Sequence, residues 1–170
     1  REPFRSLLPE TLTAKRTTPW PKYNPNYARL LFRKSGYCNN KKLKLPLTFR
    51  SNVPADKLLA LTWQAQVSKD LSDCFELVLN GVESTTIYRQ LSKGAFQSVI
   101  LDWRGAYPDA IAYLSPLLSC TKISNMTCEK GEAVISGSFW ASHQIERALI
   151  KSDEIEGSDR DQQLIIINNY

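Results

Sequence analysis

The chain has 170 residues, of which 42% are hydrophobic and 23% charged, a balance that is typical of a globular protein and excludes a disordered one. No apolar run approaches the roughly 18 residues that a membrane-spanning helix needs. The net charge is +5, but the densest basic residues, Arg33-Lys34, Lys41-Lys42 and Lys44, lie around a turn at Gly36 and Asn39-Asn40. This pattern indicates a solvated basic loop, so no nucleic-acid partner is expected.

The chain begins with Arg1 instead of methionine, and its first residues are rich in proline, threonine and arginine. We expect an irregular N-terminal segment over 1–22 and one domain over 23–170. No signal-peptide pattern follows Arg1, and we expect both ends to be cut from a longer chain. The N-terminus therefore does not indicate a compartment.

The first predicted helix and strand have clear local signals. Asn24-Pro25 supplies an N-cap and a proline at the first helical position, which predicts a helix over 25–35 that ends at Gly36. Apolar residues then alternate with polar ones over 43–49, which predicts a strand with one buried face. Pro46 cannot donate a hydrogen bond, so this strand should lie at an edge or carry a bulge there.

The helical stripe of Ala60, Trp63, Val67 and Leu71 predicts a helix over 54–71. Leu58 and Leu59 widen this stripe, so the helix is expected to pack heavily. The next predicted elements are a strand over 74–80, a short helix from Ser84 or Thr85 to Leu91, and a strand over 97–103. Helices near 140–152 and 158–168 finish the chain, and 104–139 is predicted to be mostly loop with one helical turn near 109–114.

Strands separated by helices imply crossover connections. The sequence therefore predicts an α/β fold with a mixed sheet flanked by helices.

Four cysteines are present, without a CxxC pair, and His143 has no zinc-like spacing to them, so no metal site is expected. An even number of cysteines suits disulfides in an exported protein, whereas buried reduced thiols in a cytosolic protein are the alternative. Cys120 and Cys128 bracket a polar loop of about nine residues and are predicted to pair. Cys38 and Cys74, each near the end of a predicted helix, are the second candidate pair.

No nucleotide-binding loop, dinucleotide fingerprint or nucleophile elbow occurs. Asp102 and Asp109 are conceivable as an acid–base pair and His143 as a base, but nothing in the sequence sets their separation. Such residues are more often helix caps or solvated groups. We therefore expect neither an enzyme nor a bound cofactor.

The stretch from Gly94 to Leu114 carries the strongest functional signal. A predicted strand ends at Trp103, a loop containing Pro108 follows, and a helix begins at Asp109. Ligands of open α/β sheets bind at the carboxyl ends of strands, where a tryptophan provides a large apolar wall. The alternative is that Trp103 fills the hydrophobic core.

This stretch resembles the oligopeptide and dipeptide family of ABC-importer solute-binding proteins. The resemblance is carried by Gly94-Ala95-Phe96-Gln97, Trp103, Tyr107-Pro108-Asp109-Ala110 and Tyr113-Leu114. Tyr23 to Leu31, followed by Ser35-Gly36-Tyr37, is similar to a helix of the same family. The similarity covers roughly residues 7–116, and the order and spacing of the motifs make it specific.

The resemblance implies one lobe of a type II periplasmic-binding-protein-like fold, here most of the C-terminal lobe of a two-lobed protein. It implies a periplasmic or other extracytoplasmic location. The implied partners are a small-molecule or peptide ligand held between the lobes and the ABC-importer membrane subunits, with the protein itself a monomer. The implied ligand-binding residues are Trp103, Arg104, Gly105, Ala106, Tyr107 and Asp109.

The chain departs from the family pattern at Ala106. Peptide-binding members of the family place an aspartate there, which pairs with the amino group of the ligand. Burying an ammonium without a partner costs several kcal/mol, so the resemblance extends to the pocket but not to a peptide ligand. Arg104 instead favours an anionic or polar ligand, unless it is only an exposed surface arginine. A ligand-sensing lobe of a regulatory protein with the same fold is the alternative function.

Overall fold

The computed structural model describes residues 8, 12 and 21–169, with side chains described as far as Ile167. Contacts divide the chain into two compact units. The first unit comprises Lys22–Gln90 and Gly94–Asp102, and the second includes Leu8, Leu91–Lys93 and the chain from Trp103 onward. Most of the N-terminal segment predicted over 1–22 lies outside the described residues.

The first unit begins with helix α1, Pro25–Lys34, as predicted. The side chain of Asn24 accepts a hydrogen bond from the backbone N–H of Tyr27 at 2.9 Å, and Pro25 occupies the first turn. After the helix, Gly36 adopts a φ of 84°, the left-handed conformation that ends helices. The ring of Phe32 stacks on Phe75 with centroids 5.4 Å apart, which attaches α1 to the unit.

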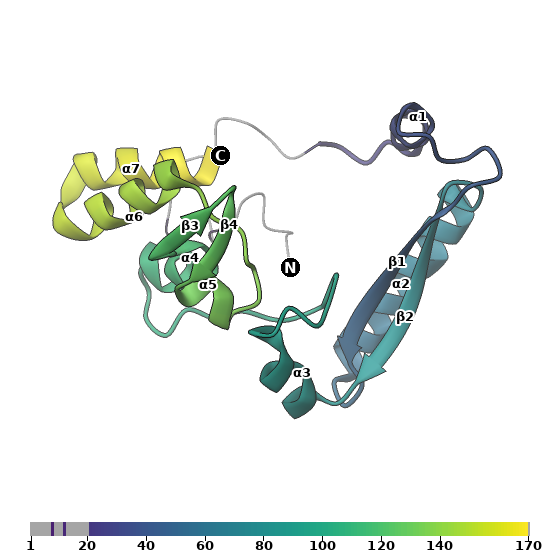
Figure 1. The fold of residues 1–170 in the computed structure, drawn as a ribbon, viewed down its shortest axis with the longest axis horizontal. Coiled ribbons are helices and arrows are strands. Elements are labelled where there is room, and N and C mark those ends of the chain that lie inside the picture. The colour runs from purple at the N-terminus through teal and green to yellow at the C-terminus, as the bar shows by residue number, and fades with distance from the viewer. Residues whose placement is uncertain (1–7, 9–11, 13–20, 170) are drawn as a thin grey trace. The chain divides into compact units, whose positions relative to one another are not determined.

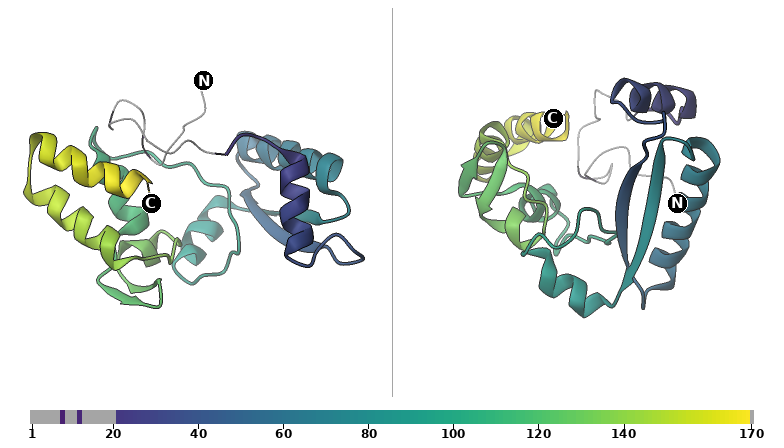
Figure 2. Two further views of the ribbon diagram at one scale, coloured as in Figure 1. Left: turned by 90° about the horizontal axis from the view of Figure 1, so that it is seen from above. Right: turned by 45° about the vertical axis from the view of Figure 1, so that its right-hand side comes forward.

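Strands β1, Leu43–Arg50, and β2, Phe75–Val82, form a parallel pair. Helix α2, Pro54–Leu71, connects them and lies along one face of the pair (Figures 1 and 2). The buried side chains between helix and strands form the core of the unit. They are Leu47, Phe49, Ala60, Val67 and Leu77.

The expected tight packing of Leu58 and Leu59 is wrong, because these side chains are 67% and 54% exposed. Trp63, on the same predicted stripe, is 44% exposed. A helix on a two-stranded sheet meets it along one narrow stripe, here the line from Ala60 through Val67. Additional apolar residues on α2 therefore remain outside this contact.

The strand predicted over 97–103 is reduced to one parallel bridge between Thr48 and Val99. The N–H of Thr48 donates to Ser98 at 3.0 Å, and its carbonyl accepts from the N–H of Ile100 at 2.8 Å. Pro46 faces the same segment, and its carbonyl accepts from the Ser98 hydroxyl at 2.6 Å. Because Pro46 has no N–H, it contributes no backbone donor there, and the ladder does not extend from Thr48 back to Pro46.

A buried ion pair closes the carboxyl end of β1. The guanidinium of Arg50 donates to both carboxylate oxygens of Asp56, at 2.6 and 2.9 Å. Arg50 also donates to Asp102 and, at 3.2 Å, to the hydroxyl of Tyr88 on helix α3, Ser84–Leu91. The Asp56 carboxylate raises the pKa of Arg50 above its usual range, so the guanidinium stays charged although it is 8% exposed.

The second unit contains more regular structure than predicted for 104–139. Helix α4, Ala110–Leu118, is followed by the antiparallel strands β3, Lys122–Ser124, and β4, Thr127–Lys130, and by α5, Glu132–Ile135. The hairpin turns at Asn125 and Met126, whose φ angles are 47° and 63°. Such turns usually contain Asn-Gly. Here methionine occupies the glycine position, so the sequence did not predict the hairpin.

Two helices complete the second unit, α6, His143–Glu154, and α7, Gly157–Asn169, as predicted to within a few residues. They pack on α4 (Figure 1). The main buried residues of this core are Leu8, Leu114, Ile145, Leu149 and Leu164. The α/β class is therefore confirmed, with parallel and antiparallel pairing in separate two-stranded sheets.

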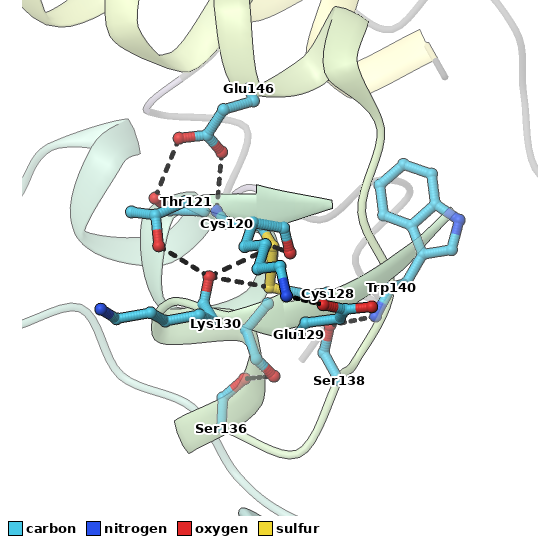
Figure 3. Close-up of a disulfide and its surroundings, with 12 residues drawn as sticks. Cys120, Thr121, Cys128, Glu129, Lys130, Ser136, Ser138, Trp140 and Glu146 are labelled. Carbon is cyan, nitrogen blue, oxygen red and sulfur yellow. Dashed lines mark hydrogen bonds and ion pairs between the residues drawn. A yellow bond between two sulfur atoms is a disulfide. The ribbon is translucent and has the colours of Figure 1, made fainter. Parts of the chain in front are cut away.

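Both predicted disulfides are present, Cys38–Cys74 in the first unit and Cys120–Cys128 in the second. Figure 3 shows the second bridge beside Glu146 of α6, which accepts a hydrogen bond from the N–H of Cys120 at 2.7 Å. Gly131 passes so close that a Cβ there would lie 2.7 Å from the Cα of Cys120. The disulfide therefore lies in a tightly packed part of the second unit.

None of the helices that the structure describes combines the length and apolarity required to cross a bilayer.

Candidate functional site

The predicted ligand-binding residues lie on one continuous loop of the second unit, from Trp103 to the start of α4. The loop follows the single bridge at Val99 and has no helix or strand of its own. Its shape therefore depends on contacts with α4 and α7 rather than on a backbone ladder.

Trp103 is 48% exposed, so it does not fill the core. Its indole N–H donates to the backbone carbonyl of Ala112 on α4 at 3.3 Å. One edge of the ring is thus attached to the helix while about half of the side chain faces solvent. This is the combination expected of an aromatic wall that is held in place and still accessible.

Gly105 lies against the ring of Tyr113. A Cβ at Gly105 would approach that ring to 2.4 Å, closer than atoms can come. Glycine allows this close approach, and a larger residue here would require the Tyr113 ring to move. Gly105 and Tyr113 both lie in the stretch from Gly94 to Leu114, but the sequence did not indicate that they are in contact.

Asp109 is the N-cap of α4, as its place before the helix suggested. Its Oδ1 accepts from the N–H of Ile111 at 2.8 Å and from the Arg160 guanidinium at 2.7 Å. The Arg160 hydrogen bond is the largest cause that lowers the pKa of Asp109 below its usual value. Arg160 also donates to the Ser152 carbonyl at 2.9 Å, so it links α7, the end of α6 and the loop.

Arg104, Ala106 and Tyr107 are exposed on the loop, Tyr107 to 55%. The structure thus brings the six predicted residues together on one segment and attaches Trp103, Gly105 and Asp109 to their surroundings. Sequence reasoning missed Arg160, which is 51 residues from Asp109. No local signal marks it, because the contact exists only after α7 folds back onto α4.

The ion pairs of Asp102 and Asp109 do not support the hypothesis that these two residues form an acid–base pair. Asp102 belongs to the first unit and pairs with Arg50, whereas Asp109 belongs to the second and pairs with Arg160. Each carboxylate already neutralises an arginine. His143 is the first residue of α6 and is exposed.

Cys38, Asp73 and Cys74 bring two sulfur atoms and a carboxylate oxygen within 4.8 Å of one another. Both sulfurs belong to a disulfide, and Asp73 forms an ion pair with Arg29 at 3.1 Å. A disulfide offers no thiolate to a metal ion. This cluster is therefore a covalent bridge beside an ion pair.

A family model described as bacterial extracellular solute-binding proteins, family 5, middle region, matches residues 1–125. That match covers most of the chain, including the first unit, the loop and α4. No curated protein matched the sequence.

Solved structures share the fold across nearly the whole chain. The murein tripeptide binding protein MppA of Escherichia coli is 16% identical over 94% of the chain, with a TM-score of 0.75. A periplasmic oligopeptide-binding protein of Borrelia burgdorferi is 20% identical over 98%, with a TM-score of 0.74. A dipeptide binding protein of Pseudoalteromonas sp. SM9913, solved with Met-Leu, is 22% identical over 97%, with a TM-score of 0.77.

The chain spans only 30–31% of the length of these three proteins. At this level of identity the similarity establishes the fold, and the family model establishes the relationship. The chain belongs to the bacterial extracellular solute-binding proteins of family 5.

Proposed function

We propose that this chain is most of the C-terminal lobe of a two-lobed protein that binds a small solute and delivers it to an ABC importer. Membership of the solute-binding family supports the binding role. The coverage of about a third of each related structure supports the assignment of residues 23–170 to one lobe of a larger protein. Ligand closure between two lobes is the motion that such a protein would use.

The main support for the proposed ligand site is that Trp103 is both hydrogen-bonded and exposed. Its indole N–H is bound to Ala112, yet 48% of the residue is exposed. A tryptophan that served only the core would be covered by its own unit. In our proposal the exposed part of Trp103 is a wall of the ligand pocket, flanked by Arg104, Gly105, Ala106, Tyr107 and Asp109.

The ligand class follows from the residues beside Trp103. The related structures include a tripeptide-binding and a dipeptide-binding protein, which supports an oligopeptide or a similar small solute. Ala106 offers only a methyl group, so this position cannot neutralise the amino group of a ligand. Arg104 is exposed and would favour an anionic or polar group.

We further propose that the complete protein works outside the cytoplasm, in the periplasm or at the cell envelope, as a monomer that docks on the importer's membrane subunits. The two disulfides support this location, because such bonds persist in oxidising compartments. No cofactor or catalytic group is needed for this function.

The role of Trp103 can be tested by calorimetry on the complete protein with di- and tripeptides and their N-acetylated forms. Trp103→Ala should weaken binding by about tenfold or more, because a central aromatic anchor is removed. Trp63→Ala is the matched control, since Trp63 on α2 is exposed to a similar extent, 44%. Equal effects of the two substitutions would refute the assignment of the site.

A second substitution tests whether position 106 lies beside the amino group of the ligand. Ala106→Asp places a carboxylate on the loop and should favour ligands with a free amino group over their N-acetylated forms. Ala106→Asn is the control, because it has nearly the same shape without the charge. An unchanged preference in both variants would mean that position 106 does not face the ligand's amino end.

A further inference from the structure

Helix α4 contains an internal proline. Pro116 has no N–H, so it cannot donate to the carbonyl of Ala112, four residues earlier, as an ordinary residue would in a helix. The helix nevertheless continues to Leu118, and the N–H of Ser119 donates to the Ser115 carbonyl at 2.9 Å. The Ala112 carbonyl therefore lacks the N–H donor that the residue four positions later would supply in a regular helix.

Trp103 supplies a donor to that carbonyl. Its indole N–H lies 3.3 Å from the Ala112 oxygen, and an indole nitrogen can only donate. Ala112 itself is 8% exposed, so water has little access to replace the missing helical bond. A polar group in such a place is costly to leave without a hydrogen bond.

The proline also affects the direction of the carbonyl. A proline ring inside a helix clashes with the carbonyl four residues earlier, which pushes that carbonyl away from the helix axis. An outward carbonyl at Ala112 is accessible to a side chain beside the helix. The neighbouring contact of Gly105 with Tyr113 places the loop at the same turn of α4.

We infer that Pro116 is a positioning residue for Trp103. By withholding an N–H from Ala112 and turning its carbonyl outward, Pro116 creates the acceptor that fixes the orientation of the indole ring. The importance of that orientation for ligand binding rests on the proposed function, whereas the link between Pro116 and Trp103 does not.

The test is the Trp103 indole N–H signal in ¹H–¹⁵N NMR spectra of the ligand-free chain. Trp103→Phe assigns the signal, and the other three of the four tryptophans serve as internal references. Pro116→Ala restores the helical donor and should shift the Trp103 signal and speed its hydrogen exchange by about threefold or more, the range expected when one ordinary hydrogen bond is lost. The other indole signals should stay in place.

Pro54→Ala is the matched control. Pro54 occupies the first turn of α2, where a restored N–H has no helical acceptor, so the Trp103 signal should not respond. An unchanged Trp103 signal in Pro116→Ala, or an equal response in Pro54→Ala, would overturn the inference.

A double-mutant cycle gives a second readout that needs no assigned spectrum. The effect of Pro116→Ala on unfolding should differ between the wild type and the Trp103→Phe background, because only the wild type has an indole bond to lose. Additive effects would overturn the inference. Both experiments omit ligand, so a negative result here leaves the proposed function standing, and a failed calorimetric test of Trp103→Ala leaves the link between Pro116 and Trp103 standing.

Discussion

Arg160 on α7 donates to the carboxylate of Asp109, the residue that caps α4 at the end of the candidate ligand loop, at 2.7 Å. The two residues are 51 positions apart in the chain. Both side chains are about one quarter exposed, at 27% and 28%, so water screens the pair only in part. The last helix of the second unit thereby stabilises the residue at which the loop ends.

This ion pair predicts acid sensitivity of the second unit. The folded pKa of Asp109 lies below the unfolded value of about 3.9, so the carboxylate stabilises the fold above that pH. The stabilisation is lost as the pH falls below about 4 and through the lower folded pKa. Asp109→Asn should therefore be less stable than wild type at pH 7 and nearly equal to it at the acid end.

Urea unfolding at several pH values measures this difference. Glu156→Gln, which removes an exposed carboxylate from the same unit, is the control and should give only a small difference in stability. A deficit of Asp109→Asn that is the same at every pH would show that charge does not contribute.

The buried pair of Arg50 and Asp56 predicts a strong asymmetry between single and double substitutions. Arg50→Met leaves the Asp56 carboxylate buried without its cation, which should cost about 3–5 kcal/mol. Arg50→Met combined with Asp56→Leu removes both charges and should recover most of that loss. Chemical unfolding of the single and double variants provides the test, and a loss below about 1 kcal/mol in Arg50→Met would contradict burial of the pair.

The two disulfides should differ in their contribution to stability. Cys38 and Cys74 are 36 positions apart, and Cys120 and Cys128 are 8 apart. The chain-entropy relation gives about 4 kcal/mol for the longer loop and about 2.5 kcal/mol for the shorter one. Paired substitutions to alanine, followed by urea unfolding, should show the same order.

Thiol titration gives an independent check on both bonds. The described cysteines are all paired, so the native protein should show no reactive thiol, and the denatured and reduced protein should show four. Reactive thiols before reduction would contradict one or both bonds.

Gly131 should tolerate alanine less well than Gly36. Both residues have positive φ, at 147° and 84°, so each substitution carries a conformational cost of about 1 kcal/mol or more. Only at Gly131 would the new methyl group meet backbone, with Cys120 Cα at 2.7 Å, whereas nothing lies within 4 Å at Gly36. Thermal unfolding of Gly131→Ala and Gly36→Ala compares these effects, and equal losses would refute the close approach.

The isolated chain should bind ligand weakly. A pocket between two lobes needs both walls, and one wall buries only part of a ligand's surface. Calorimetry with di- and tripeptides should detect binding in the complete protein and little in this chain alone. Submicromolar binding by the chain alone would contradict a site shared between lobes.

Local signals in the sequence were sufficient for helices α1, α2, α3, α6 and α7 and for strands β1 and β2, but not for α5 or the second half of α4. Asn24-Pro25 and Gly36 set the limits of α1, and the alternation over 43–49 gave β1, because capping and periodicity act within a few residues. The family was also accessible from sequence, since its motifs keep their order and spacing along the chain.

Contacts between distant segments required the tertiary structure. The strand predicted over 97–103 had a suitable pattern, but its pairing depends on a neighbouring strand, and Pro46 offers no donor on one side of the single bridge at Thr48. The hydrogen bond from Trp103 to Ala112 and the ion pair from Arg160 to Asp109 likewise depend on how the chain folds back on itself. Sequence alone therefore determined which segment carries the candidate site, and the fold decided how its side chains are held, because hydrogen bonds between distant residues leave no periodic signal in the chain.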